Sequence, residues 1–254
     1  MHKARSTYGT VEVIDEDGVR TLYLGSRTVQ SSMRVDRPHE LVLSYTRSMM
    51  AFLLFRPEPA RALLLGLGGG SLARFIRHAL PGTHVTAVEI NPAVIAAARE
   101  HFFLPADDAQ LNVELGDGAD YVAARSACAD VIMVDAYDGD EQVDALASDK
   151  FYAHCSTALA PDGVLVANVW SNDRRFDAIV GRIEAAFPRG VLCLPAKKPG
   201  NVVVLGFDRS PGQPSWIDLR RHARTLEARY GLEFVEFVGA LGRMNPHDDK
   251  RLKV

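Results

Sequence analysis

Three carboxylates follow strand-like runs of the sequence at the points where β-strands would end. Glu89 and Asp135 come directly after such runs, and Asp117 comes one glycine after another. If the runs form parallel strands, their carboxyl ends meet at one edge of a sheet, where open α/β sheets bind ligands. The side chains therefore predict a polar ligand site at that edge, with hydroxyl and amino groups as the ligand atoms that carboxylates bind.

A glycine-rich turn precedes these carboxylates. Gly66, Gly68 and Gly70 follow the apolar run 63–65 and lead into a helix-like stretch. Glycines there let a ligand approach the backbone beside a helix N-terminus, and Glu89 stands about 20 residues on, where an acidic residue holds a ribose. The alternative is a turn that only packs strand against helix. We favour nucleoside binding, and a P-loop is excluded because no Gly-Lys-Ser/Thr follows.

Two of the acidic positions have a second interpretation. Asp117, together with Gly118, is placed to accept a hydrogen bond from an adenine amino group, but the same side chain could cap a following helix. Asp138 lies in an acidic stretch that begins after Asp135 and reaches Asp144. That stretch is either a solvated loop or an electronegative pocket for a cationic substrate.

From residue 60 onward, strand-like and helix-like segments alternate along the chain. This pattern predicts an α/β, Rossmann-like fold with about seven mostly parallel strands and helices on both faces of the sheet. Asn91 and Pro92 suit the start of a helix, as N-cap and first helical residue. The expected strands are 62–65, 85–88, 111–115, 131–134, 163–169 and an antiparallel hairpin of 191–194 with 202–205. The expected helices are 71–78, 93–101, 151–159, 176–187 and 216–230, with a polar tail after them.

The first part of the chain has a different pattern. The runs 11–14 and 21–24 flank an Asp-Gly turn, which is a hairpin signal. An apolar spacing typical of a helix covers 38–55, and the prolines after it end that helix. We therefore expect a small N-terminal β-rich domain with a helix over residues 1–58 and the catalytic domain over 59–254.

The composition excludes several classes of function. The net charge of −3 gives no basic field for a nucleic-acid backbone. No apolar stretch is long enough for a transmembrane helix, and the first ten residues lack the apolar segment of a secretory signal. We therefore expect no nucleic-acid or membrane partner, and a cytoplasmic location by default. The three cysteines lack metal-ligand spacing, so no metal is expected.

Together these motifs resemble the spermidine synthase family, the polyamine aminopropyltransferases. The resemblance runs through residues 60 to 170 and extends to the N-terminal piece, and it implies an S-adenosylmethionine-dependent transferase fold. The motifs that carry it are the glycine turn, Glu89-Ile90-Asn91, Gly116-Asp117-Gly118, Val134-Asp135 and Asp149-Lys150-Phe151-Tyr152.

The resemblance assigns roles on the donor side. It implies decarboxylated S-adenosylmethionine, or S-adenosylmethionine itself, as a co-substrate that binds on the glycine turn without a metal. Glu89 would then hold the ribose, and Asp117 with Gly118 would hold the adenine. The N-terminal sheet is a candidate homodimer interface.

On the acceptor side, the resemblance implies a small-molecule amine such as a polyamine. Asp135 would take a proton from the attacking amine, which needs a base because a protonated amine has no lone pair. Asp138 corresponds to a second aspartate of the family's motif. Gln30 and Tyr45 correspond to residues that line the family's substrate pocket.

Several residues depart from the family's pattern. Gly69 stands where the family's loop carries an aspartate, and Ser71 replaces its last glycine. Gly139 follows Asp138 in place of a proline. Arg47 occupies a common glutamate position, where a cation would oppose polyamine binding, and Asn168 replaces a glutamine.

Three hypotheses follow. The first is aminopropyl transfer from decarboxylated S-adenosylmethionine to a polyamine or related amine, with Asp135 as the base. The second is methyl transfer from S-adenosylmethionine to a small molecule, which the missing loop aspartate at Gly69 favours. The third is a non-catalytic protein that binds an adenosyl nucleoside, which the altered sequence around Asp138 favours.

Overall fold

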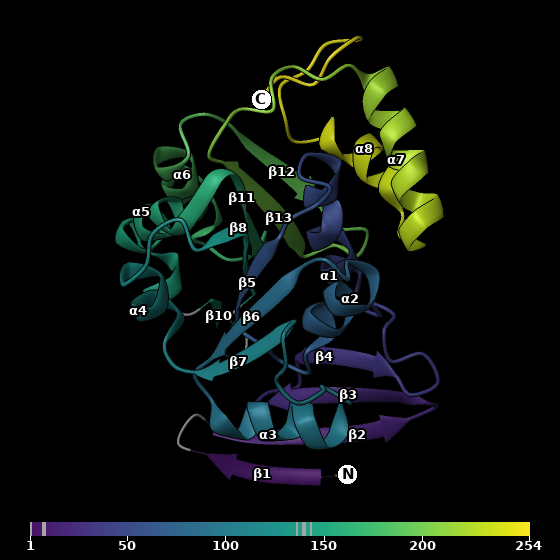
Figure 1. Cartoon of the computed structure of the whole chain (residues 1–254), viewed down its shortest axis with the longest axis vertical. Coiled ribbons are helices and arrows are strands. Elements are labelled where there is room, and N and C mark those ends of the chain that lie inside the picture. The colour runs from purple at the N-terminus through teal and green to yellow at the C-terminus, as the bar shows by residue number, and fades with distance from the viewer. Residues whose placement is uncertain (1, 7–8, 136, 139–140, 143) are drawn as a thin grey trace.

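A seven-stranded sheet forms the centre of the molecule in the computed structural model, which describes residues 2–6, 9–135, 137–138, 141–142 and 144–254 (Figure 1). The strand order is β12-β13-β11-β8-β5-β6-β7, and all neighbouring pairs are parallel except those of β13 with β11 and β12. The expected seven-stranded fold and the terminal antiparallel hairpin are therefore confirmed. The strands are β5 (Arg61–Leu65), β6 (His84–Glu89), β7 (Leu111–Leu115), β8 (Ala129–Val134), β11 (Leu159–Trp170), β12 (Val191–Pro195) and β13 (Asn201–Phe207).

The chain order reverses between β5 and β8. From β5 the chain adds β6 and then β7 on one side, and it returns to place β8 on the other side of β5. Open α/β sheets bind ligands outside the carboxyl ends of strands at such a reversal. The fold thus directs attention to the ends of β5 and β8, which are the glycine turn and Asp135.

Helices cover both faces of this sheet, as Figure 1 shows. One face carries α4, α5 and α6, and the other carries α1, η1, α2, α7 and α8. The helices are α1 (Ser44–Met49), η1 (Met50–Leu54), α2 (Ser71–Ala79), α3 (Pro92–His101), α4 (Gly118–Ala123), η2 (Asp144–Ala147), α5 (Asp149–Ala158), α6 (Phe176–Ala186), α7 (Trp216–Tyr230) and α8 (Phe234–Leu241). None of the helices in the described residues is long and apolar enough to cross a membrane.

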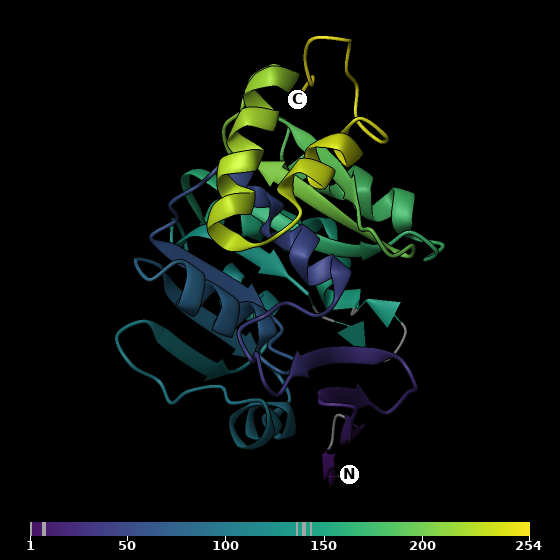
Figure 2. The same cartoon turned by 90° about the vertical axis from the view of Figure 1, so that its right-hand side faces the viewer.

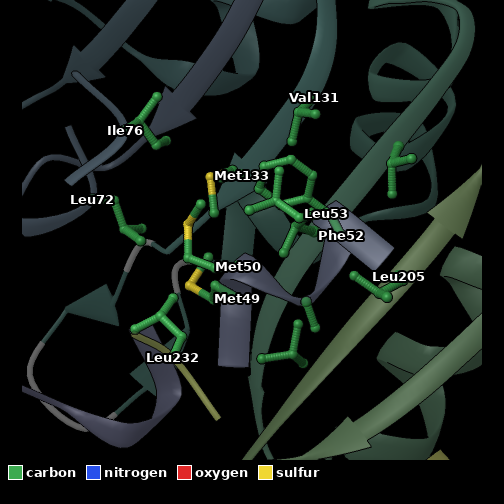
Figure 3. Close-up of a cluster of buried hydrophobic side chains, with 14 of the residues drawn as sticks. Met49, Met50, Phe52, Leu53, Leu72, Ile76, Val131, Met133, Leu205 and Leu232 are labelled. Carbon is green, nitrogen blue, oxygen red and sulfur yellow. The ribbon is translucent and has the colours of Figure 1, made fainter. Parts of the chain in front are cut away.

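Alternate residues of the central strand β8 enter opposite cores. Val131 and Met133 pack with the short helices α1 and η1, whose Met49 and Phe52 are fully buried (Figure 3). Ile132 and Val134 face α4, α5 and α6. Because side chains alternate across a strand, burial on both faces explains why the run is continuously apolar.

The N-terminal strands form a separate antiparallel sheet, β1-β2-β3-β4, at the end of the molecule away from α7 and α8 (Figure 2). Asp17 and Gly18, both with positive φ, form the predicted turn between β2 and β3. Helix α3 packs Val94 and Ala97 against this sheet, in a cluster shared with Phe102. The strands are β1 (His2–Ser6), β2 (Gly9–Glu16), β3 (Val19–Leu24) and β4 (Val29–Arg34), and a two-residue pair is formed by β9 (Tyr137–Asp138) and β10 (Glu141–Gln142).

Two helix predictions were wrong in their extent. The helix expected over 38–55 begins only at Ser44, because Leu43 is extended and the carbonyls of Leu41 and Val42 accept from the Arg47 side chain. The expected polar tail contains α8, whose apolar face is buried against the core. The division of the chain after residue 58 stays a prediction, and both α1 and η1 pack in the core of the large sheet.

Candidate active site

A cavity of about 520 Å³ opens at the carboxyl ends of the parallel strands. Its walls come from those strand ends, from the β3–β4 region and from α1, so the N-terminal sheet and the large sheet build it together. Most of the predicted site residues line it, namely Gln30, Tyr45, Gly66, Gly68, Glu89, Asp117, Gly118 and Asp135.

Two predicted residues differ from this pattern. Gly70 does not line the cavity; it is the N-cap of α2, in a left-handed conformation with φ of 74°. An added Cβ would lie 3.0 Å from a methyl group of Leu104, so Gly70 serves the turn and its packing. Asp138 is in β9, and its side chain lies outside the described part of the structure.

The glycine turn needs glycine at the two positions that face the cavity. Gly66 and Gly68 have φ of 97° and 52°, a region that other residues rarely occupy. Gly66 donates to the carbonyl of Val88 on the neighbouring strand, at 2.9 Å. The turn therefore presents bare backbone to the cavity beside the start of α2, a surface that suits close approach of a nucleoside.

Glu89 connects the glycine turn to the next helix. One carboxylate oxygen accepts from the backbone N–H of Leu67 at 2.9 Å, and the other accepts from that of Asn91 at 3.0 Å. Burial raises the pKa of Glu89, and the hydrogen bonds from backbone amides partly offset this effect. The carboxylate is held at the cavity wall, where its remaining lone pairs can accept from ribose hydroxyls.

Asp117 is a helix cap that also lines the cavity. Its side chain accepts from the N–H groups of Ala119 and Asp120 at the start of α4, so the capping interpretation is confirmed. Gly118 follows as the first helical residue, and a Cβ there would contact Leu65 at 3.4 Å. The cap fixes Asp117 in place beside the strand ends, and the proposed adenine contact remains a prediction.

Asp135 is half-buried, and its carboxylate accepts hydrogen bonds from Asn168 and Tyr45. Its Oδ1 accepts from the Asn168 side-chain amide at 2.9 Å, and the amide oxygen of Asn168 accepts from Asn201 Nδ2 at 3.0 Å. Loss of hydration raises the pKa of Asp135, while hydrogen bonding from Asn168 and Tyr45 lowers it. A carboxylate in this environment is a better proton acceptor than an exposed aspartate.

Tyr45 and Gln30 bring the N-terminal segment to the site. Tyr45 is on α1 and donates its hydroxyl to the carbonyl of Gln30 on β4, at 3.3 Å. Both residues line the cavity. Tyr45 also hydrogen-bonds the Asp135 side chain. Residues separated by 90 or more positions in the sequence thus converge on one carboxylate.

Comparison with known proteins agrees with this arrangement. The model of the spermine/spermidine synthase domain matches residues 43–192. The chain belongs to the spermine/spermidine synthase family. It is 47% identical over 235 residues to the polyamine aminopropyltransferase of Chromobacterium violaceum, covering 92% of this chain and 90% of that protein. It is 43% identical over 251 residues to the protein of the same name from Neisseria meningitidis serogroup B, covering 98% and 95%.

Solved structures share the fold at low sequence identity. A probable spermidine synthase from Corynebacterium glutamicum aligns with a TM-score of 0.75 and 20% identity, covering 98% of this chain and 97% of that one. Spermidine synthase from Thermotoga maritima also aligns with a TM-score of 0.75 and 20% identity, covering 95% and 83%. The expected Rossmann-like transferase fold with a small N-terminal sheet is confirmed.

Two departures from the family's pattern have structural explanations. A Cβ at Gly69 would lie 2.8 Å from Ser31 Oγ and 2.9 Å from Phe102 Cδ1, so this turn has no room for the family's aspartate. Arg47 is absent from the cavity lining and instead bonds Glu233 at 3.0 Å. The expectation that Arg47 would oppose an amine in the pocket was therefore wrong, because its charge is used elsewhere.

Other residues of the site were missed from the sequence. Arg27, Lys198 and Asn201 line the cavity, and Asn201 completes the hydrogen-bond chain to Asp135. Since β13 runs antiparallel to β11, its first residue pairs with the last residue of β11 and lies at the ligand-binding edge. The predicted hairpin was the available signal, but its direction relative to β11 was needed to place its loop.

Arg74 was also missed, and it supports the glycine turn from behind. Its Nη1 donates to the carbonyl of Gly69, and its Nε donates to that of Pro38 at 3.0 Å. Burial lowers the pKa of Arg74 to about 10. The guanidinium therefore joins the glycine turn, which forms one wall of the cavity, to the segment that precedes α1, which forms another.

Proposed function

We infer that the chain transfers an aminopropyl group from decarboxylated S-adenosylmethionine to an amine, with Asp135 as the base. The observation that supports this most directly is the position of Asp135. It lies at the chain reversal of the sheet, in one cavity with the glycine turn and Glu89 and beside Tyr45. Family membership at 47% identity over nearly the whole chain supports the same reaction.

The donor would occupy the half of the cavity formed by the turn and the ends of β6 and β7. Glu89 would accept from its ribose hydroxyls, and Asp117 with Gly118 would face its adenine. The backbone at Gly66 and Gly68 would leave room for the sulfonium and the adjacent carbon chain. This half combines the bare backbone of the glycine turn with apolar side chains such as Val88 and Ile90, a surface that suits a nucleoside.

The acceptor would occupy the half near Tyr45 and Gln30. The neutral amine nitrogen attacks the methylene carbon next to the sulfonium, forming an N–C bond while the C–S bond breaks. The electron pair of the C–S bond goes to sulfur, and methylthioadenosine leaves. Asp135 takes the proton that the amine must lose, and its raised pKa suits that transfer.

Asp135→Asn tests this function directly. Without the base we expect kcat to fall by about 10²- to 10⁴-fold, the usual contribution of general-base catalysis. The measurement is methylthioadenosine release from decarboxylated S-adenosylmethionine with a panel of amines. Calorimetric binding of methylthioadenosine should stay within about threefold, because Asp135 is not placed in the nucleoside half. Unchanged turnover in the variant would contradict the assignment of the base.

Methyl transfer is the second candidate. The human eEF1A lysine and N-terminal methyltransferase is 31% identical over 154 residues, which is 54% of this chain and 22% of that protein. The missing loop aspartate at Gly69 also suits a donor that retains its carboxylate. Product analysis separates the reactions, because methyl transfer releases S-adenosylhomocysteine and aminopropyl transfer releases methylthioadenosine.

A cytoplasmic location and a homodimer formed through the N-terminal sheet stay predictions.

A further inference from the structure

The loop between β12 and β13 places a lysine at the acceptor half of the cavity. Lys198 lines the cavity, and its backbone N–H donates to Ser44 Oγ at 3.3 Å. Ser44 is the first residue of α1 and precedes Tyr45. The end of the same loop is Asn201, which connects through Asn168 to the Asp135 carboxylate. Lys198 is thereby placed on the acceptor side of Asp135.

A second cation, Arg27, also lines the cavity. Arg27 comes from the connection between β3 and β4, the segment that also carries Gln30 into the cavity. Among the side chains that the structure describes, neither Arg27 nor Lys198 forms an ion pair. The neighbouring Lys197 differs, because it bonds Glu236 at 3.0 Å and does not line the cavity.

The described carboxylates of the cavity already have other partners. Glu89 and Asp117 accept from backbone amides in the donor half, and Asp135 accepts from Asn168. Counting only side chains that the structure describes, the acceptor half therefore combines one carboxylate, which the reaction uses as a base, with two cations. A diamine would bring a second ammonium toward these cations, whereas an acceptor with a carboxylate would bring them an opposite charge.

We propose that Lys198, assisted by Arg27, binds a carboxylate of the acceptor, so that the preferred acceptor is an amino acid with a second, reactive amine. This inference rests on the proposed aminopropyl transfer and specifies its substrate class. The reactive amine points to Asp135 while the carboxylate lies against Lys198 near the cavity rim. The bond changes are those given above, and the acceptor's carboxylate takes no part in them.

A matched pair of acceptors provides the test. 1,4-Diaminobutane and 2,5-diaminopentanoate have the same four-carbon spacing between amines and differ by one carboxylate. With saturating decarboxylated S-adenosylmethionine, we expect wild-type protein to have the higher kcat/KM for 2,5-diaminopentanoate. Lys198→Gln should lower that value by about 10- to 100-fold, the loss expected for a hydrogen bond to a charged group. The loss should appear in KM, with kcat nearly unchanged.

The control variant is Lys197→Gln, which removes an adjacent positive charge outside the cavity and should leave both acceptors unchanged. In Lys198→Gln, turnover of 1,4-diaminobutane should stay level or rise. A wild-type preference for the diamine that Lys198→Gln does not alter would overturn the inference while leaving aminopropyl transfer intact. That result would instead favour the acidic stretch around Asp138 as the determinant of acceptor charge.

Two further outcomes separate this inference from the reaction itself. If no amine yields methylthioadenosine, the proposed function fails, and calorimetry with 2,5-diaminopentanoate in the presence of methylthioadenosine decides the subsite. Weaker binding by Lys198→Gln than by Lys197→Gln would support it, and equal or undetectable binding by all forms would overturn it. If intact S-adenosylmethionine is preferred as donor and Lys198→Gln removes that preference, the carboxylate belongs to the donor and the acceptor assignment is overturned.

Discussion

The carboxylates of the cavity differ in the groups that hold them. Glu89 and Asp117 accept from backbone N–H groups that the fold itself supplies. Asp135 accepts from a side-chain amide, and that amide is oriented by Asn201. Because Asn201 Nδ2 bonds the oxygen of Asn168, the amide nitrogen of Asn168 is directed at Asp135. The base is thus positioned by a residue that does not contact it.

This arrangement predicts a specific effect of Asn201→Ala. The Asn168 amide becomes free to rotate, and Asp135 loses a donor that stabilises its charged form. The pKa of Asp135 should rise further, because a hydrogen bond to the charged form lowers a carboxyl pKa. Activity requires the deprotonated form, so the acidic limb of the kcat profile should move to higher pH, and kcat at any pH on that limb should fall.

Asn172→Ala is the control for Asn201→Ala. Asn172 also lines the cavity but is not part of the hydrogen-bond chain from Asn201 through Asn168 to Asp135. Its substitution should leave the pH profile in place. An unshifted acidic limb in Asn201→Ala would show that Asn201 serves only the packing of the hairpin.

Among the elements, the glycine turn is the most tightly constrained. Arg74 holds the carbonyl of Gly69 from one side, while Ser31 and Phe102 contact Gly69 from the other. In the family's pattern this position is an aspartate. The N-terminal sheet of this chain therefore packs closer to the turn than an aspartate would permit.

Gly69→Asp should restore the family's residue at the expense of stability. Its Cβ would meet Ser31 and Phe102 well inside normal contact distance, and overpacking of this kind costs about 1–3 kcal/mol. For a chain of this length, each kcal/mol lowers Tm by about 2–4 °C in thermal unfolding. Gly69→Asp combined with Ser31→Gly, which removes the nearest atom, should recover part of the loss. An unchanged Tm in the single variant would show that the turn can shift.

The elements that the sequence predicted well are those governed by local signals. The strands β5, β6, β7, β8 and β11 and the helices α2, α3, α5 and α6 follow from continuous apolar runs, from glycine turns and from caps such as Asn91. The short elements α4, β9, β10 and η2 were not predicted. The start of α1 was missed because the Arg47 side chain satisfies carbonyls that a helix would otherwise use. The contribution of Lys198 and Asn201 to the site depends on long-range strand pairing, which has no local sequence signal.

At the scale of the whole molecule, the candidate active site lowers the free energy of unfolding. Burial raises the pKa of both Glu89 and Asp135, so the charged forms are less favourable in the folded chain than in the unfolded chain. This destabilisation is absent below the unfolded pKa of these groups and grows as the pH rises toward their folded values. Several surface aspartates, Asp108 among them, act in the opposite sense because arginine partners lower their pKa.

Asp135→Asn should therefore stabilise the fold at neutral pH while it reduces activity. The neutral amide removes a poorly hydrated charge and can still accept from Asn168. We expect Tm at pH 7 to rise by a few degrees, at about 2–4 °C per kcal/mol gained. The difference from wild type should shrink as the pH falls toward about 4, where Asp135 of the wild type becomes protonated in both states. A lower Tm at pH 7 would contradict this account.

The β12–β13 hairpin has an evolutionary and practical consequence. β12 is the edge strand of the sheet, and its pairing with β13 leaves the connecting loop at the cavity rim. Mutations in that loop can accumulate without disturbing the strand ends that would hold the nucleoside. Exchange of the loop residues 196–200 between relatives is therefore a way to change the acceptor preference while the strand ends and the candidate base stay the same.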